Sequence, residues 1–334
     1  MSQSSTMNGQ PSLDVTIVVP LLDEAESLQE LRSGIDRAMA GLTYEIVFVD
    51  DGSQDTSWDV IQGLHDAHPE SVRGIRFARN YGKSAALQKG FEAAQGEVVF
   101  TMDADLQDDP EELPAMRKQL LDGGLDLVSG WKKKRHDPLS KTIPTKLYNW
   151  ATRRMSGIHL HDFNCGLKCY RWQVVKAIEV QGEMHRYIPM LAKTAGFDKI
   201  GEKVVTHHAR PYGVSKFGLE RFTNGLLDLM TVGFIGRFGR KPMHFFGLVG
   251  MLMFLLSSGL FLGIGSYKVW ALANDTPAKN LADLSWFYVA LTGMILGAQF
   301  FLSGFLAEMV SRNNPERTDY RILSRLEDGS PSGN

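Results

Sequence analysis

Apolar runs alternate with amphipathic stretches along the first 130 residues of the chain. The runs are short and rich in Val and Ile, and they are DVTIVVP (14–20), YEIVFVD (44–50), VRGIRFA (72–78), EVVFTMD (97–103) and LDLVSG (125–130). Near-continuous apolar strands that alternate with helices indicate a mostly parallel sheet covered on both faces. We therefore predict an α/β domain in which ligands bind at the carboxyl ends of the strands.

Two later segments, 245–267 and 284–307, contain no Asp, Glu, Lys, Arg or His. Each reaches the roughly 20 residues that an α-helix needs to cross a bilayer. A soluble domain rarely contains two consecutive runs of this kind, so we predict transmembrane helices rather than buried core helices.

Basic residues flank the outer ends of this pair of segments: Arg237, Arg240, Lys241, Arg312, Arg317, Arg321 and Arg325. The positive-inside rule then places the large N-terminal portion and both termini in the cytoplasm, as part of an integral protein of the plasma (inner) membrane. Residues 1–12 are polar and lack an apolar core, so no signal peptide is expected there.

Composition narrows the class of protein only a little. The chain has 334 residues, 43% of them hydrophobic, and a net charge of -2, which fits one large or two smaller domains and gives no indication of a nucleic-acid partner. Cys165 and Cys169 are too few for a disulfide framework, and we expect free thiols in a reducing compartment.

The predicted organisation has five parts. They are a flexible tail (1–12), a catalytic domain (13–212), an amphipathic interfacial segment (213–241), a two-helix membrane anchor (242–310) and a cytoplasmic tail (311–334). The interfacial segment places Phe222, Leu226, Leu229 and Met230 at helical spacing. The sequence leaves the oligomeric state open, although paired amphipathic and spanning helices are compatible with a homo-oligomer.

Acidic residues gather in TMDADLQDD (101–109), directly after an apolar run. If the strand extends to Asp103, the alternation of side chains aims Asp103 and Asp105 to the same side. Two such carboxylates can hold a hard divalent cation. The alternative is that one Asp caps the next helix and the others are solvated.

A second acidic turn, VDDGSQDT, follows the strand that ends at Asp50. In a structural interpretation Gly52 supplies an unusual backbone dihedral and Ser53 caps the next helix. In a functional one, Asp50 or Asp51 accepts hydrogen bonds from a base or a ribose. The chain has no GxxxxGK[ST] loop and no GxGxxG after the first strand, so neither an NTPase nor a dinucleotide dehydrogenase is indicated.

Four motifs, VPLLDEAESL, VDDGSQDTS, RNYGKSAALQKGF and MDADLQDDPEELP, occur in this order. Over residues 13–220 the chain resembles the family 2 glycosyltransferases with the Rossmann-like GT-A fold. It is similar in particular to the polyprenyl-phosphate sugar transferases, such as dolichyl-phosphate mannose synthase and the bactoprenol glucosyltransferases.

The resemblance implies an inverting transfer of one hexose from a nucleotide-diphosphate sugar to a polyprenyl phosphate, undecaprenyl or dolichyl. UDP-glucose is the first expectation for the donor and GDP-mannose the second. The residues implied in nucleotide-sugar binding are Pro20, Leu21, Glu24, Asp50, Asp51, Lys83, Asp103, Ala104 and Asp105. Those implied in holding Mg²⁺ or Mn²⁺ are Asp103, Asp105 and Gln107.

The chain becomes basic at WKKKRHDPLSK (131–141). Such a run is either a solvated face or part of a phosphate site. By resemblance the acceptor phosphate is bound by Lys132, Lys141, Thr145, Arg210, Ser215 and Lys216, with Lys141 and Thr145 in place of the family's Arg-x-x-x-Ser. The loop that contains Arg210 is expected to close over the diphosphate. His207 and His208 are expected to be structural, because adjacent strand residues face opposite ways.

The segment HDFNCGLKCYR (161–171) resembles the family's Asp-x-x-Ser-Gly-Phe element. Asp162 and Asp105 are the catalytic candidates, with a turn-capping role as the alternative for Asp162. Lys168 stands where processive polysaccharide synthases carry the Gln of Gln-x-x-Arg-Trp, and two spans are too few to line a polymer channel, so a processive synthase is not expected. A rival from another class is a membrane scaffold or regulator whose transferase-like domain only senses a nucleotide.

Overall fold

The computed structural model describes residues 11–133, 149–150, 152–154, 156–182, 184–208, 211, 242–277 and 279–312. Contacts divide the chain into two compact units, Met1–Gly233 and Phe234–Asn334. The predicted interfacial segment (213–241) lies outside the described residues, as do most of the two predicted tails (1–12 and 311–334).

The first unit is built on a seven-stranded sheet in the order β3-β2-β1-β4-β6-β5-β7. The strands are β1 (Leu13–Leu21), β2 (Tyr44–Asp50), β3 (Val72–Arg76), β4 (Gly96–Thr101), β5 (Leu127–Trp131), β6 (Lys168–Arg171) and β7 (Ile200–Val204). β6 pairs antiparallel with β4 and β5, and the other pairs are parallel. The mostly parallel sheet expected from the sequence is confirmed.

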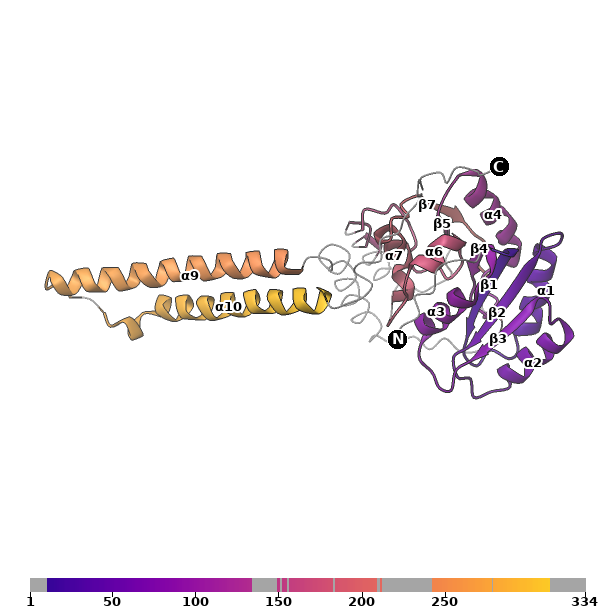
Figure 1. Cartoon of the computed structure of the whole chain (residues 1–334), viewed down its shortest axis with the longest axis horizontal. Coiled ribbons are helices and arrows are strands. Elements are labelled where there is room, and N and C mark those ends of the chain that lie inside the picture. The colour runs from indigo at the N-terminus through magenta and orange to yellow at the C-terminus, as the bar shows by residue number, and fades with distance from the viewer. Residues whose placement is uncertain are drawn as a thin grey trace, which may run out of the picture. The chain divides into compact units, whose positions relative to one another are not determined.

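Helices cover both faces of this sheet (Figure 1). On one face lie α1 (Leu28–Ala38), α2 (Ser57–Ala67) and, after the short 3₁₀ turn η1 (Pro110–Glu112), α4 (Leu113–Asp122). On the other lie α3 (Lys83–Ala93), α6 (Trp172–Ala177) and α7 (Ile188–Thr194), which follows the 3₁₀ turn η2 (Met184–Tyr187). β1, β2, β4 and β5 are buried on both sides over most of their length, which explains their near-continuous apolar sequences.

The parallel strands end at one edge of the sheet, and the amino end of β6 meets them there. The turns at this edge differ from the sequence expectation in two details. β4 ends at Thr101 and Leu106 has a φ of 59°, so Asp103 and Asp105 lie in a turn and strand alternation does not set their directions. α2 begins only at Ser57, so Ser53 does not cap it; the Ser53 hydroxyl accepts a hydrogen bond from the Asp23 N–H at 2.9 Å.

The second unit contains two long helices, α9 (Pro242–Ala273) and α10 (Ser285–Arg312), with the 3₁₀ turn η3 (Leu281–Asp283) between them. α9 and α10 lie side by side (Figure 1). Their mean hydropathies are 2.2 and 1.8, and only 11% and 17% of their most apolar stretches are buried. Both are long and apolar enough to cross a membrane, and this exposure is the opposite of what a soluble core helix shows.

Glycines allow α9 and α10 to approach closely. A Cβ at Gly250 would lie 2.6 Å from the carbonyl oxygen of Gly297, and one at Gly297 would lie 2.7 Å from the amide nitrogen of Phe254. Small residues at such contacts let two helix backbones pack together inside a membrane, where burial of apolar surface provides little drive for association.

Candidate active site

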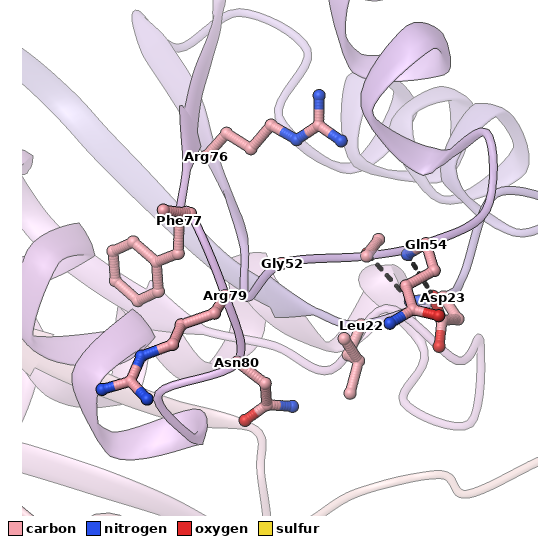
Figure 2. A pocket seen from close by; sticks show the side chains of 10 residues that line it. Leu22, Asp23, Gly52, Gln54, Arg76, Phe77, Arg79 and Asn80 are labelled. Carbon is pink, nitrogen blue, oxygen red and sulfur yellow. Dashed lines mark hydrogen bonds between the residues drawn. The ribbon is translucent and has the colours of Figure 1, made fainter.

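A cavity of about 770 Å³ opens at the carboxyl ends of β1, β2 and β3. Its walls come from three loops and consist of Leu22, Asp23, Gly52, Ser53, Gln54, Arg76, Phe77, Ala78, Arg79 and Asn80. Figure 2 shows Asp23 and Gln54 on one side of the cavity, across from Arg79 and Asn80. The volume lies in the range of small-molecule sites, roughly 300–1,000 Å³.

Backbone contacts hold these loops together. The Gln54 N–H donates to the Asp23 carboxylate at 2.8 Å. Gly52 has a φ of 80°, and a Cβ at this position would lie 2.5 Å from the carbonyl carbon of Arg79. Only glycine permits both the left-handed turn and this approach, so Gly52 brings the loop after β2 against the loop after β3.

Asp50 and Asp51 do not line the cavity, but their carboxylates contact residues of the loops that do. Asp50 is fully buried; it accepts a hydrogen bond from the Ser53 N–H at 2.8 Å and lies 3.5 Å from Arg76 Nε. Asp51 accepts hydrogen bonds from the N–H groups of Tyr81 (2.7 Å) and Gly82 (2.9 Å). Burial raises the pKa of Asp51, and these two bonds oppose that rise.

The other predicted nucleoside contacts also lie close to the cavity without forming the walls described above. Pro20 and Leu21 are buried in β1, and the Glu24 N–H donates to the Ser57 hydroxyl at 3.0 Å. Their contact with a nucleotide, like that of Asp50 and Asp51, stays a prediction. Arg76 was not anticipated, because it sits inside the strand pattern; its signal was a charged residue at the last position of a strand that also contains Arg73.

The Asp103 carboxylate lies beside the cavity's third loop. Lys83, the first residue of α3, makes an ion pair with it. Burial alone would raise the pKa of Asp103, but the Lys83 ammonium outweighs it and lowers the pKa to about 2. A Cβ at Gly166 would lie 2.6 Å from Asp103 Oδ2. The fold therefore joins α3, the turn after β4 and the loop before β6 at one ionised carboxylate.

Two further lysines surround Asp103. The ammonium of Lys168, which is 3% exposed, donates to the Cys165 carbonyl, and burial lowers its pKa. The Lys132 ammonium lies 2.8 Å from the buried Asp108 carboxylate. Desolvation would lower the pKa of Lys132. Nearby negative groups, Asp108 first among them, outweigh this effect, and the net result is a raised pKa. Lys132 was predicted to bind the acceptor phosphate; that contact stays a prediction, and the structure gives its ammonium a protein partner.

His185, on η2, lies close to Lys83, Lys168 and Asp103, and no sequence motif predicted this position. Its ring Nδ1 and its backbone nitrogen each lie 3.1 Å from the hydroxyl of Ser84, the second residue of α3. Burial, and then the charges of Lys83, Arg186 and Lys168, hold the pKa of His185 well below its usual range. The imidazole is therefore neutral near pH 7 and acts as a hydrogen-bonding group.

The catalytic candidates occupy turns. Asp162 is 2% exposed and accepts a hydrogen bond from the Asn164 N–H at 3.1 Å, the turn-capping role given above as its alternative. Asp105 accepts one from the Gln107 N–H at 3.2 Å, and Ala104 between Asp103 and Asp105 is buried. Lys141, Thr145, Arg210, Ser215 and Lys216 lie outside the described residues.

His207 and His208 face different carboxylates. His207 Nδ1 is 4.0 Å from Asp108, and His208 Nε2 is 3.2 Å from Asp109. Within the part of the chain that the structure describes, no three His, Cys, Asp or Glu side chains form a metal cluster. The contact of each ring with a different carboxylate is compatible with the structural role expected of this pair, which stays a prediction.

Comparison with known proteins gives the family. A model of glycosyl transferase family 2 matches residues 16–178. A dodecaprenyl-phosphate galacturonate synthase of Rhizobium johnstonii is 36% identical over 90% of this chain and 88% of its own length. The chain belongs to glycosyltransferase family 2.

Further relatives agree with this assignment. An undecaprenyl-phosphate 4-deoxy-4-formamido-L-arabinose transferase of Pseudomonas syringae is 34% identical over 92% of this chain and 88% of its own length. The fold is similar to that of glucosyl-3-phosphoglycerate synthase from Mycobacterium tuberculosis in complex with UDP, with a TM-score of 0.52, 19% identity, and coverage of 67% of this chain and 80% of that one. The GT-A fold is confirmed, and this family 2 member is an enzyme of the transferase class.

Proposed function

We propose that this family 2 glycosyltransferase moves one sugar from a nucleotide-diphosphate sugar to the phosphate of a polyprenyl phosphate at the cytoplasmic surface of a membrane. One observation carries the proposal. The segment from Arg76 to Lys83 lines a nucleoside-sized cavity at one end and meets the ionised Asp103 at the other. Two observations support the choice of acceptor. The names of the relatives contain a polyprenyl phosphate, and the chain has two apolar helices.

The residues around Asp103 suit the departure of a nucleoside diphosphate. With the nucleoside in the cavity, the diphosphate lies toward Lys83, and fixed positive charge there stabilises the charge that builds on it as its bond to the anomeric carbon breaks. An oxygen of the acceptor phosphate forms the new bond from the opposite face, which gives inversion. A phosphate monoester is already anionic near neutral pH, so this attack needs little help from a base, in keeping with the burial of Asp162.

The acidic turn fits a divalent metal. Asp103, Asp105 and Gln107 offer oxygen donors, and the lowered pKa keeps Asp103 ionised at neutral pH. Mg²⁺ is usually held by one or two carboxylates together with substrate phosphates, so a site without three convergent acidic or imidazole groups is suitable. Mg²⁺ or Mn²⁺, when bound, would help to neutralise the leaving diphosphate.

The relatives change the order in which donors should be tried. The names of the two relatives carry galacturonate and formamidoarabinose, not glucose or mannose. We therefore place a nucleotide-linked hexuronate first and keep UDP-glucose and GDP-mannose as the donors expected from sequence resemblance. Thermal stabilisation of the purified protein by a panel of nucleotide sugars with Mn²⁺ ranks them, because a ligand that binds only the folded state raises its stability.

Transfer itself is tested with Asp105→Ala. We expect the variant to lose at least about 100-fold in transfer to polyprenyl phosphate, the scale typical of removing one electrostatic contact to a developing charge. Asp66→Ala, which removes an exposed carboxylate on α2, is the control and should transfer normally. Full transfer by Asp105→Ala would refute the role of this turn, and a wild type that binds donor but transfers from none would favour the regulator.

A further inference from the structure

Both carboxylate oxygens of Glu202, a residue of β7, contact the dipeptide His161–Asp162. Its Oε1 accepts hydrogen bonds from the N–H groups of His161 (2.7 Å) and Asp162 (3.2 Å). Its Oε2 lies 2.7 Å from His161 Nδ1. The Glu202 side chain is 12% exposed, and hydrogen bonds to an ionised acceptor are stronger than neutral ones. One side chain thus fixes both the backbone and the ring of the loop that precedes β6.

The His161 ring has a second contact, with Trp131. The His161 ring stacks on Trp131 with centroids 4.0 Å apart and planes 12° apart. Trp131 ends β5, and the next residue, Lys132, pairs with Asp108 in the acidic turn after β4. Through His161, Glu202 therefore connects β7 to the end of β5 and to the turn that contains Asp103.

The same loop reaches Asp103 directly. Gly166 packs so closely against the Asp103 carboxylate that a Cβ would lie 2.6 Å from it, and the Gly166 carbonyl accepts a hydrogen bond from the Thr101 hydroxyl at 2.8 Å. A shift of the loop by a few tenths of an ångström would therefore change the position of the carboxylate. The segment 161–166 therefore contacts Glu202 at its first residues and Asp103 at its last.

The place of these contacts in the sheet separates them from the nucleoside cavity. The cavity lies at the ends of β1, β2 and β3, whereas Trp131 ends β5, Glu202 lies in the middle of β7 and the loop leads into β6. A group that steadied only the fold would affect both halves alike. A group that positions the second half should affect transfer to the acceptor and leave the affinity of the cavity for the nucleoside part of the donor intact.

We propose that Glu202 is a positioning residue for the half of the site that contains Asp103 and Lys132, a predicted acceptor-phosphate residue, and that it holds the loop 161–166 in register with Asp103 through His161 and Asp162. The inference rests on the proposed transfer to a polyprenyl phosphate. Glu202 does not touch the reacting atoms; it acts through the two backbone N–H groups and the His161–Trp131 stack.

The test compares Glu202→Ala and Glu202→Gln with a matched control, Asp126→Asn, in the full-length protein. Asp126 also joins β5 to β7, through the Lys199 N–H at 3.1 Å, but at the opposite edge of the sheet. For Glu202→Ala we expect kcat/KM for the polyprenyl phosphate to fall by up to about 100-fold, the cost of a small misplacement of reacting groups. The Kd for the free nucleoside of the donor, which occupies only the cavity, should stay within about twofold. Glu202→Gln keeps an oxygen for both N–H groups and should recover most of the activity.

Asp126→Asn should show near-normal kinetics with both substrates. Parallel losses of nucleoside affinity and acceptor kcat/KM in Glu202→Ala, or losses equal to those of Asp126→Asn, would overturn the inference while leaving wild-type transfer and the proposed function intact. If Glu202→Ala does not fold, His161→Ala replaces it, since it removes the ring that joins Glu202 to Trp131. An unchanged kcat/KM for the acceptor in that variant would likewise refute the role.

Discussion

At the scale of single residues, the chemistry concentrates on the Asp103 carboxylate, which Lys83 and a divalent cation would share. The lysine ammonium is an ion-pair partner of Asp103 Oδ1 and holds the pKa of this carboxyl at about 2. A metal ion bound to Asp103 therefore meets a positive neighbour, while a diphosphate bound beside it gains an attractive one. The same side chain opposes one ligand and favours the other.

Replacement of Lys83 should separate these two effects. In Lys83→Met we expect Mn²⁺ to bind the nucleotide-free protein about tenfold more tightly, since removal of a like charge a few ångströms away is worth about 1–2 kcal/mol at partly exposed sites. The affinity for the donor should fall. Titration of Mn²⁺ by electron paramagnetic resonance measures the first effect and calorimetry the second. Lys89→Met, which removes the partner of the exposed Glu92 on the same helix, is the control, and weaker Mn²⁺ binding by Lys83→Met would contradict this account.

The residue types at the site could be predicted from the sequence, but the partners and the burial of their side chains could not. Asp103, Asp105 and Lys83 stand in motifs that can be read without a structure. The partner of Lys132 and the burial of Asp162 depend on which side chains the fold brings beside them. Lys168 and Glu202 carried no motif that pointed to their roles, because their importance comes from contacts with segments distant along the chain.

At the scale of elements, the five runs predicted as strands all contain strands. Each of these runs is apolar because its strand packs against helices, so periodicity was sufficient to find it. β6 and β7 were harder to predict for different reasons. β6 has four residues, and β7 is an edge strand in which no residue is fully buried, so its sequence IGEKV carries no apolar run.

The pair α9 and α10 gives an element-scale prediction. Gly297→Val should destabilise their packing by about 1–3 kcal/mol, the usual range for overpacking, because its Cβ would meet the backbone of Phe254. Gly263→Val is a matched control on α9, where no atom lies within 4 Å of the added Cβ. Thermal unfolding in detergent should show a lower Tm for the first variant only; equal Tm values for the two would mean that the close approach of the helices is not needed.

At the scale of the whole molecule, the two units have opposite surfaces. The first buries its large apolar side chains in cores on both faces of the sheet, whereas Leu256, Leu262 and Val269 in α9 are 74%, 66% and 68% exposed. So much exposed apolar surface requires a lipid environment. The topology predicted from the flanking basic residues then puts the turn between α9 and α10 on the side of the membrane opposite to the first unit.

The burial of both native cysteines makes that topology measurable. Cys165 and Cys169 are 1% and 0% exposed, and burial raises the pKa of each thiol, to about 12 for Cys165, so neither should react with a maleimide while the protein is folded. Asn274→Cys places a thiol at an exposed position after α9, and Asp66→Cys places one on the exposed side of α2. With a membrane-impermeant maleimide we expect Asn274→Cys to be labelled in intact cells and Asp66→Cys only after permeabilisation. Labelling of Asp66→Cys in intact cells would reverse the orientation and place the proposed site away from cytoplasmic nucleotide sugars.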